Sequence, residues 1–482
     1  MAPISARADR KCLQNRYDAV ERHFRGRILD EAVHGLERFE PQFSARRVIT
    51  RGQARVLASL AVAVGLAFVL APSAAGTCIA DVLAAWFLTN AVFRGLLFAA
   101  GATARRDAAA PAIADADLPR YSILVPLHHE ANIVPSLMCA LKALDYPADR
   151  LDIKLIAEAD DAETIAALQA ADLDARFHLL RVPPGEPRTK PRACNYALLF
   201  LRGDLVVIYD AEDRPQTDQL RKAAAMFAAA PREIACLQAR LNFYNAKENV
   251  LTRLFALDYA LWFDYLLPGL ERFAIPMPLG GTSNHFRVEA LAAIHGWDPY
   301  NVTEDADIGI RLARQGFGVR TLDSTTFEEA PTRIGDWIKQ RSRWQKGYMQ
   351  TWLVHMRDPR QLLRNAGPRG FVGFQLFIGG TFVSALLNPI LWAVTLAIFL
   401  LHAPMLGAEH VCLSCLAIGN GFFVALAMLG PLRRKWYALV AFGLLVPFYW
   451  GFISIAFYRA LGQLVSKPFH WEKTRHGTSR FA

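Results

Sequence analysis

The sequence has few of the features that mark a cysteine-based metal or redox site. Its 482 residues include seven cysteines, which are scattered without metal-type spacing. The one CxxC pair, Cys412 and Cys415, lies in an apolar run without histidine or acidic neighbours, so we interpret both as small buried residues. Residues 1–24 are polar and lack the apolar core of a signal peptide, so we expect this segment to stay in the cytoplasm.

The composition fits neither a soluble enzyme nor a pure bundle of membrane helices. Hydrophobic residues make up 53% of the chain, which is too many for the first, and charged residues make up 20%, which is too many for the second. The formal net charge is +10, but basic residues gather beside apolar segments, as in 431–437 and 467–476. This placement indicates membrane topology and not nucleic-acid binding.

Two apolar segments near the N-terminus are each long enough to cross a bilayer, at 54–76 and 78–101. Their outer flanks are basic (Arg51 on one side, Arg105 and Arg106 on the other) and the join between them has no Lys or Arg. The positive-inside rule therefore predicts a hairpin with both ends in the cytoplasm. Arg94 within the second segment either lines a polar path or extends towards the cytoplasmic boundary.

Apolar character returns at 371–465, where we expect about four helices, for a total of about six spans. We predict one span at 375–403, a second at 411–430, and a hairpin over 437–465 broken at Pro447. This arrangement keeps the basic residues 433–435 and the tail in the cytoplasm.

The middle of the chain has the pattern of a soluble α/β domain. Short β-rich runs at 121–126, 152–159, 177–182 and 204–210 alternate with helix-like stretches, which predicts a parallel, Rossmann-like sheet. Ligands of such sheets bind at the carboxyl ends of the strands. The predicted domains are 1–52 (cytoplasmic segment), 53–101 (membrane hairpin), 118–335 (α/β domain), 336–368 (interfacial amphipathic helices), 371–465 (membrane region) and 466–482 (basic tail).

An acidic cluster follows the last of these runs. In 209-YDAEDRP-215, the side chains of Asp210, Glu212 and Asp213 project from a turn, and hard divalent cations such as Mg²⁺ and Mn²⁺ prefer carboxylate oxygens. Taken alone, this short motif is more typical of a solvated turn. Its meaning therefore depends on the other motifs.

Six further motifs lie around this cluster in a fixed order. They are VPLHHEAN (125–132), EADDAET (158–164), TKPRACNYAL (189–198), LGGTSNHFR (279–287), VTEDADIGIRLARQGFG (302–318) and QRSRW (340–344). In this order and spacing, residues 120–355 resemble the processive family 2 glycosyltransferases. DAEDRP (210–215), EEAP (328–331) and KPFHWEKTRHG (467–477) are most similar to the bacterial cellulose-synthase-like branch, of the cellulose or mixed-linkage β-glucan synthase type.

The resemblance implies a GT-A type fold and a role for each matching position. Nine positions match the site at which the family binds the UDP-sugar donor. They are Pro126, His128, Glu130, Asp160, Lys190, Asn195, Asp210, Gln340 and Arg343. Asp210 and Glu212 match its D-x-D pair, which holds Mg²⁺ or Mn²⁺. Because the second member is Glu here and Asp213 is adjacent, the choice of metal ligand between Glu212 and Asp213 stays open.

The segment 303-TED-305 carries the strongest single assignment. The resemblance implies that Asp305 is the general base for the acceptor hydroxyl, with Glu304 as its companion. Thr303 is grouped with them, and it also has the sequence of a helix N-cap. Trp344 matches the platform for the terminal sugar of the acceptor, and 280-GGTSN-284 matches an acceptor segment that includes Gly281, Thr282 and Ser283.

The resemblance thus implies a processive, inverting transferase in the bacterial inner membrane with its catalytic domain in the cytoplasm. It would polymerise a β-1,4 or mixed β-1,3/β-1,4 glucan from UDP-glucose and pass the product across the bilayer, with a periplasmic or regulatory partner possible and no nucleic acid. Two alternatives stay open. One is a non-processive transferase that glycosylates a lipid carrier, and the other is a membrane receptor or scaffold with a vestigial site.

Overall fold

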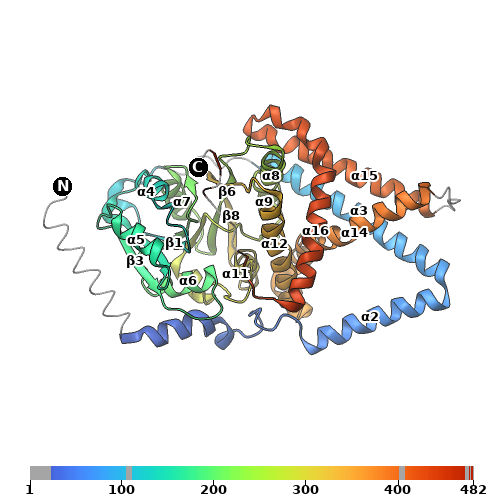
Figure 1. Cartoon of the computed structure of the whole chain (residues 1–482), viewed down its shortest axis with the longest axis horizontal. Helices are drawn as coiled ribbons and strands as arrows, with labels where there is room; N and C mark the ends of the chain where they lie inside the picture. The colour runs from blue at the N-terminus through green and yellow to red at the C-terminus, as the bar shows by residue number, and fades with distance from the viewer. Residues whose placement is uncertain (1–22, 105–110, 401–407, 473–476, 478, 481–482) are drawn as a thin grey trace.

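The structure is a computed structural model that describes residues 23–104, 111–400, 408–472, 477 and 479–480. Most of the N-terminal segment, Arg105 and Arg106, and much of the basic tail lie outside the described residues. An α/β domain occupies one half of the molecule and long helices extend from it on the other side (Figure 1). A helix over residues 23–39 runs along the edge of the α/β domain before the first long helix.

The α/β domain is built on one mixed sheet of eight strands in the order β3-β2-β1-β4-β7-β6-β8-β5. The strands are β1 (Tyr121–Leu127), β2 (Leu151–Glu158), β3 (Phe177–Val182), β4 (Leu205–Ile208), β5 (Arg214–Pro215), β6 (Ile234–Phe243), β7 (Asn284–Arg287) and β8 (Gly318–Glu328). The four predicted strands are β1–β4, and they are parallel as expected. The expectation of a wholly parallel sheet is wrong, because β7 runs antiparallel between β4 and β6. With only four residues, β7 gives no periodic signal in the sequence.

Helices cover both faces of this sheet. They are α4 (Val134–Lys142), α5 (Ala162–Ala170), α6 (Lys190–Leu198), α7 (Gln219–Ala229), α8 (Val250–Leu261), α9 (Leu267–Arg272), α10 (Val288–Ala293) and α11 (Glu304–Arg314). Successive residues of β1 enter opposite cores, since Ile123 and Val125 belong to one cluster and Leu124 to the other. Both clusters consist largely of buried aliphatic side chains, and this packing on the two faces of the sheet holds the strands in place.

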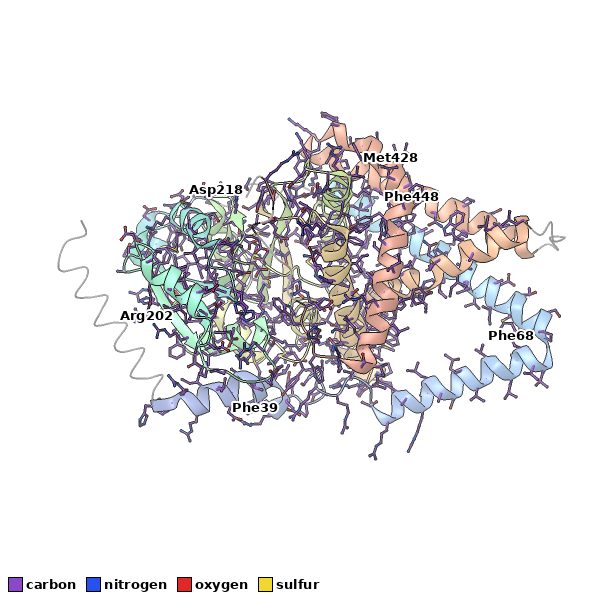
Figure 2. The ribbon with its side chains drawn as sticks, viewed as in Figure 1. Phe39, Phe68, Arg202, Asp218, Met428 and Phe448 are labelled. Atoms are coloured by element: carbon purple, nitrogen blue, oxygen red, sulfur yellow. The ribbon has the colours of Figure 1, made fainter. Side chains whose placement is uncertain are left out.

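Five helical segments are long and apolar enough to cross a membrane, among the residues that the structure describes. They are Arg51–Leu70 (α2), Pro72–Thr103 (α3), Pro359–Ala393, Leu416–Arg434 and Tyr437–Ser466. The last three include α13 (Pro359–Phe374), α14 (Gly380–Leu400), α15 (Ala408–Leu429) and α16 (Val446–Ser466). No residue of α2 is buried, and Figure 2 shows Phe68 on α2 far from the α/β domain. An apolar helix that is exposed all round fits a lipid environment.

Within the described ranges, three such segments lie in the C-terminal region, where we expected about four helices, and five in total, where we expected about six. The predicted hairpin at 437–465 is instead one continuous segment, a 3-10 turn over Tyr437–Leu445 that leads into α16. Pro447 lies in the first turn of α16, where the N–H that proline lacks would have no helical partner. A proline that we interpreted as a break therefore starts a helix.

The helix that carries QRSRW is α12 (Ile334–His355), within the range 336–368 where we expected interfacial amphipathic helices. Trp337 and Lys346 are fully buried, and α12 packs against α16 and the domain core. The Lys346 ammonium group donates to the backbone carbonyl of His470 at 2.8 Å.

At two glycines the backbone of the α/β domain is in direct contact with α3, the second membrane-type helix. A Cβ on Gly101 of α3 would lie 2.0 Å from the Tyr265 carbonyl oxygen, and one on Gly269 of α9 would lie 2.2 Å from that of Leu97. The two backbones therefore touch at both points. Nearby, Arg434 forms a two-point ion pair with Asp264 at 2.6 and 2.8 Å, which holds part of the basic cluster 433–435 against the α/β domain.

Candidate active site

One cavity of about 660 Å³ joins the strand ends of the α/β domain to the long helices. Thirteen predicted site residues line it, namely Pro126, His128, Glu130, Lys190, Asp210, Glu212, Gly281, Thr303, Glu304, Asp305, Gln340, Arg343 and Trp344. They come from the end of β1 and the loop after it, from the loop after β4, from the segment before β7, from the starts of α6 and α11, and from α12. The topology therefore brings together motifs that lie up to two hundred residues apart in sequence.

Lys190, the first residue of α6, connects the two acidic parts of the cavity. Its ammonium group forms an ion pair with Asp210 and donates a hydrogen bond of 2.6 Å to the Gly281 carbonyl oxygen. Burial would lower the pKa of Lys190, but the carboxylates of Asp210 and Glu304 outweigh that effect and the net shift is upward. Lys190 is thus a fixed cation at the centre of the site.

Glu304 and Asp305 begin α11 and face this cation. Burial, together with the neighbouring charge of Asp305, raises the pKa of Glu304 to about 8. Burial also raises the pKa of Asp305, although the Ala306 N–H, which donates to Asp305 Oδ1 at 2.7 Å, partly opposes the rise. Two adjacent carboxyl groups of this kind suit proton transfer near neutral pH.

Thr303 stands at the N-cap position of α11 as the sequence predicts, but its hydroxyl does not cap the helix. The backbone N–H of Thr303 instead donates to Asn301 Oδ1 at 3.1 Å. The side chain of Thr303 packs against Gly347 of α12. The contact of Thr303 therefore joins α11 and α12, the two helices that carry most of the site.

The acidic turn after β4 divides into exposed and hidden carboxylates. Asp210 and Glu212 line the cavity, together with Glu328 at the end of β8. Asp213 is only 2% exposed, accepts the Asp210 N–H at 2.8 Å and accepts the Thr282 hydroxyl, so it closes the turn from beneath. Burial and the neighbouring carboxylates raise the pKa values of Asp213 and Glu328 well above the usual range.

This cluster fits a divalent cation by its chemistry. No group of three or more His, Cys, Asp or Glu side chains is arranged around one point in the described ranges. A cation held by Asp210 and Glu212, with substrate phosphates as further ligands, needs no third protein carboxylate. Burial, and then the repulsion of neighbouring carboxylates, raises the Glu328 pKa, and a cation at this place would relieve that repulsion.

The QRSRW residues place unsatisfied polar atoms in the cavity. Gln340 Oε1 and Arg343 Nε are buried and have no hydrogen-bond partner among the described residues. Buried polar groups are normally paired, so both atoms are suited to a ligand. The Arg343 guanidinium carbon lies 5.0 Å from the ring centroid of Trp471, a tail residue that also lines the cavity.

Trp344 lines the cavity but is not a bare platform. The Arg341 guanidinium carbon lies 4.5 Å from its ring centroid, and the Tyr259 ring stacks on it with centroids 6.1 Å apart. These neighbours fix the orientation of the indole ring. The part of the Trp344 ring that Arg341 and Tyr259 leave uncovered is the surface that can contact a sugar in the cavity.

Several predicted residues lie away from the cavity lining. Asn195 is buried, its Nδ2 donates to the carbonyl oxygens of Ala32 and Trp297, and its Oδ1 accepts the Trp297 N–H, so its amide is fully used in packing. The structure therefore places Asn195 in packing contacts outside the cavity lining, whereas we expected it to contact the donor. Asp160 is outside the lining and pairs with Arg188 at 2.6 Å.

Thr282 and Ser283 of the acceptor segment also turn away from the cavity. The Ser283 hydroxyl hydrogen-bonds with that of Thr326 at 2.6 Å. Ser283 has a φ of 55°, which lets the chain turn into β7. Only Gly281 of the three faces Asp305, and a Cβ there would lie 3.2 Å from Asp305 Oδ2.

The sequence reasoning missed part of the lining. Arg188 and Glu328 line the cavity beside the donor residues, although both lie in or next to motifs that we had noted. Residues 469–471 of the tail also line it, and only the general resemblance of that tail pointed to them. Whether a residue lines the cavity depends on the direction of its side chain, and motif spacing does not reveal that direction.

The cavity continues among the long helices. There it is lined by Phe87, Arg94, Thr381, Ser384, Asn388, Asn420, Phe423, Trp450 and Ser454, which we call the helix arm of the cavity. Arg94 therefore faces a polar path, which was one of the two possibilities that its sequence position allowed.

Comparison with known proteins agrees with this architecture. Residues 205–458 match the family described as glycosyl transferase family group 2. The probable glycosyltransferase YdaM of Bacillus subtilis is 25% identical over 240 residues, which cover 48% of this chain and 56% of that protein. The beta-monoglucosyldiacylglycerol synthase of a Synechocystis species is 28% identical over 242 residues, which cover 50% of each chain. The chain thus spans about half the length of these relatives.

Among solved structures, the mannosyltransferase PcManGT from Pyrobaculum calidifontis, in complex with GDP-Man and Mn²⁺, superposes with a TM-score of 0.53. The identity is 20%, and the match covers 81% of this chain and 99% of that one. This likeness shows a GT-A-like Rossmann fold. The chain belongs to the family described as glycosyl transferase family group 2.

Proposed function

We propose that this protein is an inverting, processive glycosyltransferase that extends a β-glucan, β-1,4 or mixed β-1,3/β-1,4, from UDP-glucose. The observation that supports this proposal is the single cavity that holds Lys190 and Asp305 at one end and passes between candidate membrane helices at the other. A product that grows at Asp305 has a continuous route into the helices.

The proposed reaction is one displacement at the anomeric carbon. Asp305 takes the proton of the acceptor hydroxyl, the hydroxyl oxygen bonds to the anomeric carbon, and the bond from that carbon to the UDP oxygen breaks. Lys190, Arg343 and Gln340 contact the departing diphosphate through charge and hydrogen bonds. Mg²⁺ or Mn²⁺ held by Asp210 and Glu212 would supply further neutralisation of the diphosphate charge.

The ion pair between Arg434 and Asp264 supports the proposed orientation in the membrane. It holds basic residues at the same end of the long helices as the α/β domain. Because basic loops stay in the cytoplasm, the proposed location of the catalytic domain is the cytoplasmic face of the bacterial inner membrane.

Transfer of a single sugar to a lipid is a second candidate. The relatives named as beta-monoglucosyldiacylglycerol synthases favour it, since a lipid headgroup in the helix arm would reach the same base. The two candidates share donor site and chemistry. They differ in whether the product stays bound for another cycle.

Membranes that contain the full chain, supplied with radiolabelled UDP-glucose and Mn²⁺, separate these candidates. Long polymer that linkage-specific β-glucanases digest supports the first, label in the lipid extract supports the second, and no labelled product with any nucleotide sugar contradicts both. Trp344→Ala should shorten the polymer, because the cavity loses part of its sugar-facing surface. Trp392→Ala, at an exposed position of α14, is the matched control and should leave product length unchanged.

A further inference from the structure

Arg94 is a cation at membrane depth with no carboxylate of its own. It lies in α3, in a segment apolar enough to span the bilayer, and it lines the helix arm. Its guanidinium donates to the Thr381 hydroxyl at 3.2 Å and lies 5.5 Å from the Phe377 ring centroid. Among the described residues, no carboxylate comes within ion-pair distance of it. A charged side chain in such a place is costly unless it has a partner or a function.

Asp258, an acidic residue of the same cavity lining, is already paired with another cation. Asp258 of α8 accepts from Arg341 at 2.6 Å and from the Tyr449 hydroxyl at 3.3 Å. Asp258 is thus in an ion pair with Arg341 and not with Arg94. The lining residues that come from the described membrane-type helices include no other Asp, Glu, Lys or Arg. Arg94 is thus the one charged residue that these helices contribute to the cavity lining, and it has no ion-pair partner among the described residues.

The same arm offers a hydrogen-bond acceptor without a donor. Asn388 Oδ1 is buried and has no hydrogen-bond partner in the described part of the chain. The hydroxyls of Ser384 and Ser454 line the cavity with it. A ligand that satisfies this arm has hydroxyl groups to donate and one negative charge.

The helix arm and the reacting end belong to one cavity, since Arg94, Tyr348 and Asp305 all line it. An acceptor that extends along this cavity can meet Arg94 with one group and present a hydroxyl to Asp305 with another.

We propose that Arg94 recognises an acidic group, a phosphate or a carboxylate, on the hydroxylated acceptor from which synthesis starts. This rests on the proposed function, because it concerns the acceptor of that reaction. The charge selects the first acceptor. Later sugars need only the hydroxyl-binding groups of the arm.

The test uses the purified full chain and measures initial transfer of label from UDP-glucose to matched acidic and neutral acceptors. In the lipid arm of the experiment, vesicles contain phosphatidylglycerol or the uncharged monoglucosyldiacylglycerol. In the soluble arm, the acceptors are a glucuronate-ended disaccharide and cellobiose. We expect kcat/KM to favour the acidic acceptor in one arm, and that arm identifies the source of the acidic group.

Arg94→Gln should reduce this acidic-over-neutral ratio about tenfold or more, because a charged hydrogen bond is lost. Arg94→Lys should keep a large part of the ratio. Arg55→Gln, at an exposed position of α2, should leave it unchanged. Equal use of acidic and neutral acceptors by the wild type overturns this inference alone, as does an unchanged ratio in folded Arg94→Gln. Absence of transfer to every acceptor would overturn the proposed function as well.

Discussion

Gly347 of α12 lies directly against Thr303, and a Cβ at Gly347 would come 2.1 Å from the Thr303 hydroxyl oxygen. Thr303 immediately precedes Glu304 and Asp305, while α12 carries Gln340, Arg343 and Trp344. This one contact therefore sets the spacing between the proposed base and the QRSRW residues. The absence of a side chain at Gly347 allows that spacing.

Gly347→Ala should lower kcat about a hundredfold, because a misplacement of about 1 Å in an active site can have such an effect. The added methyl group must push α12 away from Thr303, at a stability loss of about 1–3 kcal/mol. Gly335→Ala is the matched control, since Gly335 is in the same helix with open space around it. Equal activity of the two variants would contradict the spacing argument.

Asp305→Asn should reduce kcat by about 10²–10⁴-fold and leave the affinity for UDP nearly unchanged, because general base catalysis contributes that much. Single-turnover transfer and UDP titration measure the two quantities separately. Glu289→Gln, on the exposed start of α10, serves as the control for a lost carboxylate. A kcat near that of the wild type would remove Asp305 from the proposed role.

The pH dependence of kcat should have an acidic limb above the ordinary carboxyl range of about 4. Burial raises the pKa of Asp305, and only its deprotonated form can accept the acceptor proton, so kcat falls as the pH decreases through this raised pKa. Lys190 holds the Asp305 pKa down. Lys190→Met should therefore move the acidic limb of the remaining activity to higher pH, and an unmoved limb would argue against Asp305 as the titrating group.

Glu212→Gln should increase the Mn²⁺ concentration needed for half-maximal activity, whereas Asp213→Asn should not. Glu212 lines the cavity, but Asp213 lies beneath the turn with its Oδ2 occupied by the Asp210 N–H and the Thr282 hydroxyl. An asparagine oxygen can accept both of these hydrogen bonds. The reverse result, with Asp213→Asn alone altering the Mn²⁺ dependence, would exchange their roles.

Asn195→Ala should lower stability by about 1–3 kcal/mol, because the buried N–H and carbonyl groups of Trp297 and the carbonyl of Ala32 lose their partner. The KM for the donor should stay the same in the folded fraction. Thermal unfolding and donor titration test both statements. A large increase in donor KM without a change in Tm would restore Asn195 to the donor site.

The sequence predicted those parts of the fold that depend on local pattern. The apolar runs that form β1 to β4 were visible because each has several buried aliphatic residues in sequence. The antiparallel β7 was not, since four residues such as Asn284–Arg287 contain too little periodicity. Pro447 misled the count of helices because a proline at the start of a helix and a proline that breaks one look alike in sequence.

The sequence also predicted part of the candidate site. Motif order located Lys190, Asp210, Asp305 and Arg343, whose side chains the fold brings to one cavity. It could not distinguish Asn195, which supports the backbone of Trp297, from a residue that faces the ligand. It also gave no role to Arg94, because the partner that decides whether a membrane arginine lines a path lies far away in sequence.

The close backbone contacts of Gly101 with Tyr265 and of Gly269 with Leu97 have a practical consequence for anyone who wishes to isolate the catalytic part. Residues 118–335 expressed without α3 would expose the surface of α9 that now meets that helix. Such a fragment would aggregate or require detergent, even though its own sheet is complete. Purification of the transferase together with its first two long helices is therefore the sound starting point.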